Sequence, residues 1–253
     1  MNNGRRNFFS KVFGAAAAAL LAGCDALSQK EGFMGMLSFG EWLNLKTHRL
    51  LIPRNALARE FTEADISRYF KPNGSTDPAD AAYKGLVKNG FARWRLTVDG
   101  LVERPAALSM GELRAMPSRT QITRHDCVEG WSCIGKWKGV PLAALLERAG
   151  LKPQARYIVF HCLDTLGSSE HKYYESIDLV DAFHPQTILA YDMNDRPLPV
   201  AHGAPLRLRV ERQLGYKMAK YVTRVEAVES FDHIAGGKGG HWEDRGYEWY
   251  AGI

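Results

Sequence analysis

From Trp94 onward, apolar residues alternate along short segments, and this pattern most limits what the chain can fold into. Trp94, Leu96 and Val98 alternate in "WRLTVDG", as the side chains of a half-buried β-strand do. The segments "TQITRHDC", "ARYIVFHC", "PLRLRVE" and "KYVTRVEAVES" are also of β type. The sequence therefore predicts several short strands between residue 94 and about residue 230.

Helix signals lie between these strands. Ser109 and Glu112 have the spacing of a capping box, which predicts a short helix over 110–115. The segment "VPLAALLERAG" predicts a second helix, with Pro141 near its start and Gly150 just past its end. A third short helix is expected in "SIDLVDAF". Strands interleaved with short helices predict a mixed α+β domain.

The flanking segments have different compositions. Residues 53–70 show helical spacing in places, "KPNGSTDPADAAYKG" is a loop by its composition, and a turn is expected at Asn194-Asp195. The aromatic residues of the Gly-rich end are expected to pack back onto the domain. The predicted organisation is an export segment (1–24), a tether with a cofactor-contact loop (25–84), the α+β domain (85–230) and an aromatic tail (231–253).

The N-terminus has the features of an export signal. In "GRRNFFSKVFGAAAAALLAGCDA" a basic stretch leads into an apolar run that is too short to span a membrane and ends at small residues. "RRNFF" is similar to a twin-arginine signal, and "LAGC" is similar to a bacterial lipobox, in which Cys24 would carry the lipid. We therefore expect export by the twin-arginine route and a lipid anchor on Cys24.

The charge balance argues against nucleic acid as a partner. The formal net charge is +5, and three of the positive charges lie within residues 1–23, which contain no acid. About +2 remains for the rest of the 253-residue chain, too little for the basic stripe that nucleic-acid binding requires. A small positive pocket for an anion remains compatible with this charge.

Cysteine usage raises the main chemical question. Without Cys24, three of the four cysteines remain, Cys127, Cys133 and Cys162, so in an oxidising compartment at least one is unpaired. Taken alone, Cys127 could be a zinc ligand, the nucleophile of a hydrolase, half of a disulfide with Cys133, or a buried core residue. The spacing of cysteines and histidines matches no zinc knuckle and no hydrolase signature.

The neighbours of Cys127 resemble a known family. "ITRHDCVEGWSCIGKWKGVPL" is similar to the molybdenum-ligating segment of the sulfite oxidase fold, in the bacterial branch that includes the protein-methionine-sulfoxide reductase catalytic subunit. The block "HPQTILAYDMNDRPLPVAHGAPLRLRVERQLGYKMAKYV" also resembles that branch. The two blocks occur in the same order as in the family, and the resemblance covers residues 70–230. It implies a mixed α+β molybdopterin-binding fold of a single domain.

The resemblance also implies a cofactor and its contacts. Molybdenum would be held by one molybdopterin and one protein thiolate, a soft ligand suited to this metal. Cys127 matches the metal ligand, and Arg124, three residues earlier, is expected either to face substrate or pterin as a catalytic residue or to form a structural salt bridge. The positions that match the cofactor-binding residues are Asn73, Thr76, Asp77, Cys127, Cys162, His202, Arg207, Met218, Ala219 and Lys220.

Some of these positions depart from the family pattern. Thr76 and Asp77 replace an aromatic-Glu pair, His202 replaces an Asn, and Cys162 replaces a Thr. These departures leave open which substrate enters the pocket. Cys133 lies outside the matched pattern and is expected to be buried, with a disulfide to Cys162 as the alternative.

The expected function is that of an exported molybdenum oxidoreductase that reduces a sulfoxide or a related S- or N-oxide. Oxidation of sulfite and a metal-free binding module are the alternatives. No haem, ferredoxin or nicotinamide motif is present in the sequence, so the expected electron partner is a membrane haem protein. We expect the mature protein at the periplasmic face of the inner membrane.

Overall fold

The computed structural model describes residues 31–167 and 169–253, and it divides into two units, Met1–Leu51 and Ile52–Ile253. The export segment 1–24 lies outside the described residues. In the first unit, part of the expected tether is the helix α2, Glu31–Leu51. A search of the described residues finds no helix that is long and apolar enough to cross a membrane.

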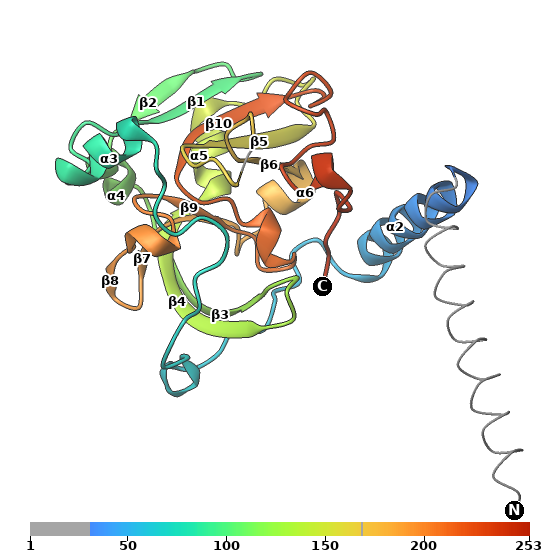
Figure 1. Ribbon diagram of the computed structural model, residues 1–253, viewed down its shortest axis with the longest axis horizontal. Coiled ribbons are helices and arrows are strands. Elements are labelled where there is room, and N and C mark those ends of the chain that lie inside the picture. The colour runs from blue at the N-terminus through green and yellow to red at the C-terminus, as the bar shows by residue number, and fades with distance from the viewer. Residues whose placement is uncertain (1–30, 168) are drawn as a thin grey trace, which may run out of the picture. The chain divides into compact units, whose positions relative to one another are not determined.

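The second unit contains two β-sheets, which Figure 1 shows one above the other. The first sheet has the order β2-β1-β10-β5-β6, and β1 and β10 are its parallel pair. Its strands are β1 (Leu96–Gly100), β2 (Ala106–Leu108), β5 (Tyr157–Cys162), β6 (Tyr174–Asp178) and β10 (Val222–Val228).

The second sheet is antiparallel. It has the order β3-β4-β7-β8, and β9 also pairs with β7. Its strands are β3 (Arg119–Asp126), β4 (Ser132–Pro141), β7 (Ile188–Met193), β8 (Arg196–Pro197) and β9 (Arg207–Arg209). The helices of this unit are α3 (Ala81–Lys88), α4 (Met110–Ala115), α5 (Leu142–Ala149) and α6 (Leu179–Ala182). The predicted mixed α+β class is confirmed.

The main core is built from both sheets and α5. It includes Leu96 of β1, Phe160 of β5, Leu189 of β7 and Leu145 of α5, all of which are almost fully buried. Because one cluster joins these elements, the two sheets share a single core, and the loops at their ends are held in fixed positions. A smaller cluster around Phe70 and Trp137 lies at the second sheet.

Several local predictions are confirmed. Helix α4 occupies 110–115 and begins with the reciprocal Ser109–Glu112 capping box. Helix α5 begins after Pro141, and Gly150 follows its end with φ of 70°. Asn194 and Asp195, with φ of 52° and 59°, form the turn between β7 and β8.

The helical prediction for residues 53–70 is wrong. That segment contains only a short 3-10 turn, η1 (Glu63–Asp65). Its backbone instead pairs with the edge of β3, where the N–H of Phe61 donates to the carbonyl of Ile122 at 2.9 Å. Contact with a distant strand thus overrides a weak local preference.

The strand β4 was not predicted, although it runs through the middle of the second sheet. A Cβ atom at Gly139 of this strand would lie 2.1 Å from the carbonyl oxygen of Leu189. Glycine is therefore required there, because the backbones of β4 and β7 approach closely. That requirement weakens the alternating pattern by which a strand is recognised in a sequence.

Candidate active site

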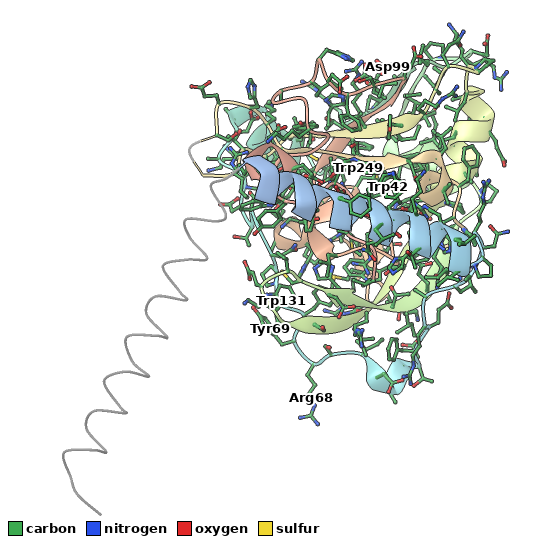
Figure 2. The ribbon with its side chains drawn as sticks, turned by 90° about the vertical axis from the view of Figure 1, so that its right-hand side faces the viewer. Trp42, Arg68, Tyr69, Asp99, Trp131 and Trp249 are labelled. Atoms are coloured by element: carbon green, nitrogen blue, oxygen red, sulfur yellow. The ribbon has the colours of Figure 1, made fainter. Side chains whose placement is uncertain are left out.

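Cys127 lies in the tight turn that joins β3 to β4. Its N–H donates to the carbonyl of Trp131 at 2.9 Å, and its carbonyl accepts from the N–H of Gly130 at 3.0 Å. Gly130 has φ of 83°, a conformation that favours glycine. Below the turn, Ser132 donates its hydroxyl to Asp126 at 2.5 Å. Figure 2 labels Trp131 beside this hairpin. The turn therefore holds the Cys127 thiol in one place.

The thiol of Cys127 opens into a pocket lined by residues from distant parts of the chain. Cys127 is 9% exposed, and burial raises the pKa of its thiol. A thiol in such a place is held as thiolate when a metal binds it. The pocket is lined by Asn73, Gly74, Ser75, Cys127, Val128, Glu129, Asp164, Leu166, Tyr173, Gly215, Tyr216, Met218, Lys220, Trp242 and Tyr247.

Lys220 binds the loop that contains Asn73 and Ser75 and holds it at this pocket. Its ammonium donates to the carbonyls of Asn73 at 2.6 Å and Ala201 at 3.1 Å, and also to the carbonyl of Ser75. The hydroxyl of Tyr221 donates to the same Ser75 carbonyl at 2.8 Å. Burial, together with the nearby Arg207 guanidinium, lowers the pKa of Lys220 to about 7.

The loop places its residues differently from the sequence-based expectation. Asn73 lines the pocket, as expected of a cofactor-contact residue. Thr76 and Asp77 are exposed and do not line it, whereas Gly74 and Ser75 do. The structure therefore places Gly74 and Ser75 at the pocket, and the cofactor contact of Thr76 and Asp77 stays a prediction. The reason is that Lys220 and Tyr221 hold the Ser75 carbonyl against the pocket, and the chain turns outward after it.

Arg207, on β9, is a fully buried cation with two unpartnered nitrogens. Its Nη1 donates to the carbonyl of His202 at 3.0 Å, but Nε and Nη2 have no hydrogen-bond partner among the described residues. The guanidinium carbon lies 4.9 Å from the ring centre of Trp137. Burial and the neighbouring Arg209 lower the pKa of Arg207 to about 9. This environment is one that an anion would stabilise.

Two histidines beside Arg207 also carry unpartnered ring nitrogens. Nδ1 of His125 accepts from Arg209 at 3.1 Å, so its proton lies on Nε2, which has no partner in the described part of the chain. Nδ1 of His202 is likewise unpartnered. Both rings contact Phe70, at centroid distances of 5.8 Å and 5.5 Å. Burial lowers the pKa of His202 to about 4, so this ring is neutral at neutral pH.

These orphaned donors fit the phosphate of a molybdopterin. Buried polar groups are almost always paired in folded proteins, so a cluster of unpaired guanidinium and imidazole nitrogens indicates a missing acceptor. A phosphate offers several anionic oxygens, and arginine binds it through a bidentate fork. Arg207 and His202 would supply the donors, the nearby Lys220 would add positive charge, and Cys127 would supply the thiolate for molybdenum.

The remaining predicted cofactor contacts are divided between pocket and core. Met218 lines the pocket, with its sulfur 3.3 Å from Nδ1 of His125. Ala219 is buried, and its carbonyl accepts from the N–H of Leu208 at 2.8 Å. Cys162 belongs to the main core and does not line the pocket, so its cofactor contact stays a prediction that the structure does not support. Alternation along β5 directs its side chain inward with Phe160.

The structure places Arg124 at the surface, in an ion pair. Arg124 is exposed and pairs with Asp126, at 2.9 Å between its Nε and the Asp126 Oδ1. Along β3, Thr123, His125 and then Cys127 face inward, so Arg124 faces solvent on the opposite side of the strand. The alternative of a structural salt bridge is the one that the structure supports.

The cysteine alternatives are also resolved by the geometry. Cys127, Cys133 and Cys162 are all free. Cys133 is half-buried rather than buried, with its sulfur 3.8 Å from the Tyr69 carbonyl oxygen. Among the described residues, no group of three His, Cys, Asp or Glu side chains could hold a metal ion. Of the described cysteines, Cys127 is the one that lines the pocket, so its thiolate is the candidate ligand for a metal there.

Asp164 and several aromatic residues were not anticipated as pocket residues. Asp164 is 3% exposed, its Oδ1 is unpartnered in the described chain, and burial raises its pKa to about 6. Tyr173, Tyr216, Trp242 and Tyr247 complete the wall. The aromatic composition of the tail indicated packing, but a sequence holds no signal for which surface of the domain such residues reach.

The chain is similar to known molybdopterin-binding proteins. The sequence profile described as "Oxidoreductase molybdopterin binding domain" matches residues 84–233. The Azospira oryzae protein named "Putative protein-methionine-sulfoxide reductase subunit YedZ1" is 36% identical over 251 residues, which are 98% of this chain and 87% of that protein.

Other similar proteins match a shorter segment. The MsrP catalytic subunits of protein-methionine-sulfoxide reductase from Xanthomonas axonopodis pv. citri and Xanthomonas campestris pv. campestris are 36% identical over 169 residues, 63% of this chain and 51% of theirs. The chain thus matches about half the length of these two relatives. A solved structure, the sulfane dehydrogenase SoxCD from Paracoccus pantotrophus, aligns with 55% of this chain and 39% of its own, at 24% identity and a TM-score of 0.49.

The matched profile spans Cys127, the buried Arg207 and Lys220, whereas Asn73, which accepts from Lys220, precedes it. It covers more than half of the chain, and the Azospira relative is matched over nearly its full length. The chain therefore belongs to the oxidoreductase molybdopterin-binding family and is a molybdenum–molybdopterin-dependent oxidoreductase.

Proposed function

We propose that this enzyme reduces a sulfoxide to a thioether. The proposal rests on the buried Cys127 thiol at the pocket and on the two unpartnered nitrogens of the buried Arg207 guanidinium. The names of the Azospira and Xanthomonas relatives, which describe protein-methionine-sulfoxide reductase subunits, support the same direction of reaction. When bound, the molybdenum cofactor supplies two-electron oxygen-atom transfer.

The residues of this chain prepare the pocket for that chemistry. Cys127 would ligate molybdenum, Arg207 would donate hydrogen bonds to the anionic part of the pterin, and Lys220 would add positive charge near it. The reduction of a sulfoxide consumes two electrons and two protons, and it yields a thioether and water. Asp164 lines the pocket and changes its protonation near pH 6, so it can hold a proton there under mildly acidic conditions.

We infer that the protein acts outside the cytoplasm, at the inner membrane. The twin-arginine-like "RRNFF" and the lipobox-like "LAGC" with Cys24 support export and lipid anchoring at its periplasmic face. A membrane haem protein would then deliver the electrons. The description of the Azospira relative as a subunit supports an assembly with at least one other protein.

Substitution of the predicted molybdenum ligand tests the site. In protein exported with its own signal, Cys127→Ser should lower bound molybdenum by about tenfold or more, because a hydroxyl replaces the soft thiolate. Cys133→Ser is the matched control, since that free cysteine does not line the pocket. Metal and pterin analysis measures both variants, and sulfoxide reduction by a reduced viologen dye is assayed beside it. Equal molybdenum in both variants would overturn the assignment.

A further inference from the structure

Most of the C-terminal tail, residues 231–253, lies beyond the matched family profile, which ends at residue 233, yet the tail forms part of the pocket wall. Trp242 and Tyr247 line the pocket and stack on each other, with ring centres 5.1 Å apart and an angle of 28° between the ring planes. Tyr216 meets Tyr247 edge to face at 5.3 Å, and its hydroxyl donates to the Glu248 carbonyl at 2.7 Å. The pocket thus has an aromatic side that the tail supplies.

Buried polar contacts hold this aromatic side in place. The ammonium of Lys217 lies 2.5 Å from Oε1 of both Glu175, on β6, and Glu243, in the tail, and all three side chains are almost fully buried. The N–H of His241 donates to the Tyr174 carbonyl at 3.0 Å. Trp242 therefore lies between two residues that are fixed to β6 or its neighbours, and it is held against the domain in one position.

The residues that line the pocket differ in chemistry. Lys220, Asn73 and Ser75 are cationic or polar, and the cofactor contacts would use them. Trp242 and Tyr247 instead present aromatic rings, and the apolar side chain of Val128, 47% exposed, also lines the pocket. A small oxyanion such as sulfite gains little from ring faces, whereas an apolar or aromatic substituent packs on them favourably.

We propose that Trp242 and Tyr247 are specificity-determining residues, which select sulfoxides that carry an aromatic or large apolar substituent. The substituent packs against the stacked rings and directs the sulfoxide group toward Cys127 and the metal that it binds. This inference rests on the proposed sulfoxide reduction. It assigns the choice of substrate to a segment that the family profile does not include.

The test compares two substrates that differ in one substituent. Reduction of methyl phenyl sulfoxide and of dimethyl sulfoxide is measured with the holoenzyme and a reduced viologen dye. Tyr247→Ala and Trp242→Leu should lower kcat/KM for methyl phenyl sulfoxide by about tenfold, mainly through KM, and change that for dimethyl sulfoxide by less than about twofold. Tyr69→Ala is the matched control, because Tyr69 is 72% exposed and lies outside the pocket.

A binding measurement supplies a readout that is independent of turnover. Methyl phenyl sulfone resembles methyl phenyl sulfoxide but is not the proposed substrate. Its binding to the holoenzyme, measured by calorimetry, should be about tenfold weaker after Tyr247→Ala. Tyr247 is 39% exposed, so this variant is expected to fold, and circular dichroism checks that it does. Equal losses of kcat/KM for both sulfoxides, or no loss for either, would overturn the role of Trp242 and Tyr247 in specificity. A native-sequence enzyme that reduces neither sulfoxide would overturn the proposed function itself.

Discussion

At the scale of single residues, Asp164 lines the pocket in a position where burial disfavours its ionised form. Its carboxyl is buried, and one of its oxygens has no partner in the described part of the chain. Burial raises the pKa from its ordinary value of 3.8 to about 6, although the charges of Lys220 and Lys172 oppose that shift. At neutral pH the group is therefore ionised in a place that disfavours the charge. Carboxyl groups with a pKa raised in this way are common at sites that transfer protons.

The raised pKa of Asp164 makes the free energy of unfolding depend on pH. Because the pKa of Asp164 is higher in the folded than in the unfolded protein, its ionisation destabilises the fold as pH rises from about 4 to about 6. Asp164→Asn removes the charge, so its gain in the free energy of unfolding should be about 2 kcal/mol larger at pH 8 than at pH 4. Urea titrations of both proteins at the two pH values measure this difference. A gain that is independent of pH would contradict the raised pKa.

At the scale of elements, helix α4 is stabilised by a capping box at its start and by an ion pair near its end. The Ser109 N–H donates to Glu112 at 2.8 Å, and the Ser109 hydroxyl accepts from the Glu112 N–H at 3.2 Å. Near the other end, Arg114 donates twice to Asp192 of β7, at 2.6 Å and 3.0 Å. The local cap starts the helix, and the arginine fixes it to the second sheet.

The capping box should have a measurable effect on stability. Ser109→Ala removes the acceptor for the Glu112 N–H and should lower the free energy of unfolding by about 1 kcal/mol. Ser118→Ala, at an exposed position after the helix, is the control and should change the free energy little. Chemical denaturation of both variants gives the comparison. Equal effects of the two substitutions would show that the cap contributes nothing.

At the scale of the whole molecule, the buried Lys217 joins the tail to the first sheet. Its ammonium is shared by Glu175 and Glu243, and the ring of Trp249 lies 5.3 Å from it. Burial raises the pKa of Glu175, and the nearby Glu243 carboxylate raises it further. One cation thus compensates two acids, and its loss would leave both acids buried without a counter-charge.

Removal of Lys217 should therefore loosen the tail. Lys217→Met should lower the free energy of unfolding by about 3 kcal/mol or more, because it leaves uncompensated buried carboxyl groups. Limited proteolysis should also cut within 231–253 sooner than in the native-sequence protein. Lys238→Met is the matched control, since Lys238 is an exposed lysine of the same tail. Similar proteolysis of both variants would contradict this role of Lys217.

The sequence by itself determined the features that depend on near neighbours. The α4 cap, the end of α5 at Gly150 and the turn at Asn194-Asp195 each need residues only a few positions apart. The family was also readable, because the Cys127 segment is a continuous motif, and the same motif predicts Cys127 as the metal ligand. Arg207 was found in the same way, from the block that surrounds it.

Only the tertiary structure decided which side chains meet. It turned Arg124 outward, replaced Thr76 and Asp77 by Ser75 at the pocket, and placed Cys162 in the core. It also brought Trp242 to the pocket of Cys127, more than a hundred residues away in the chain. The physical reason is that these outcomes depend on the pairing of strands and the burial of charges between distant segments, which local propensities do not encode.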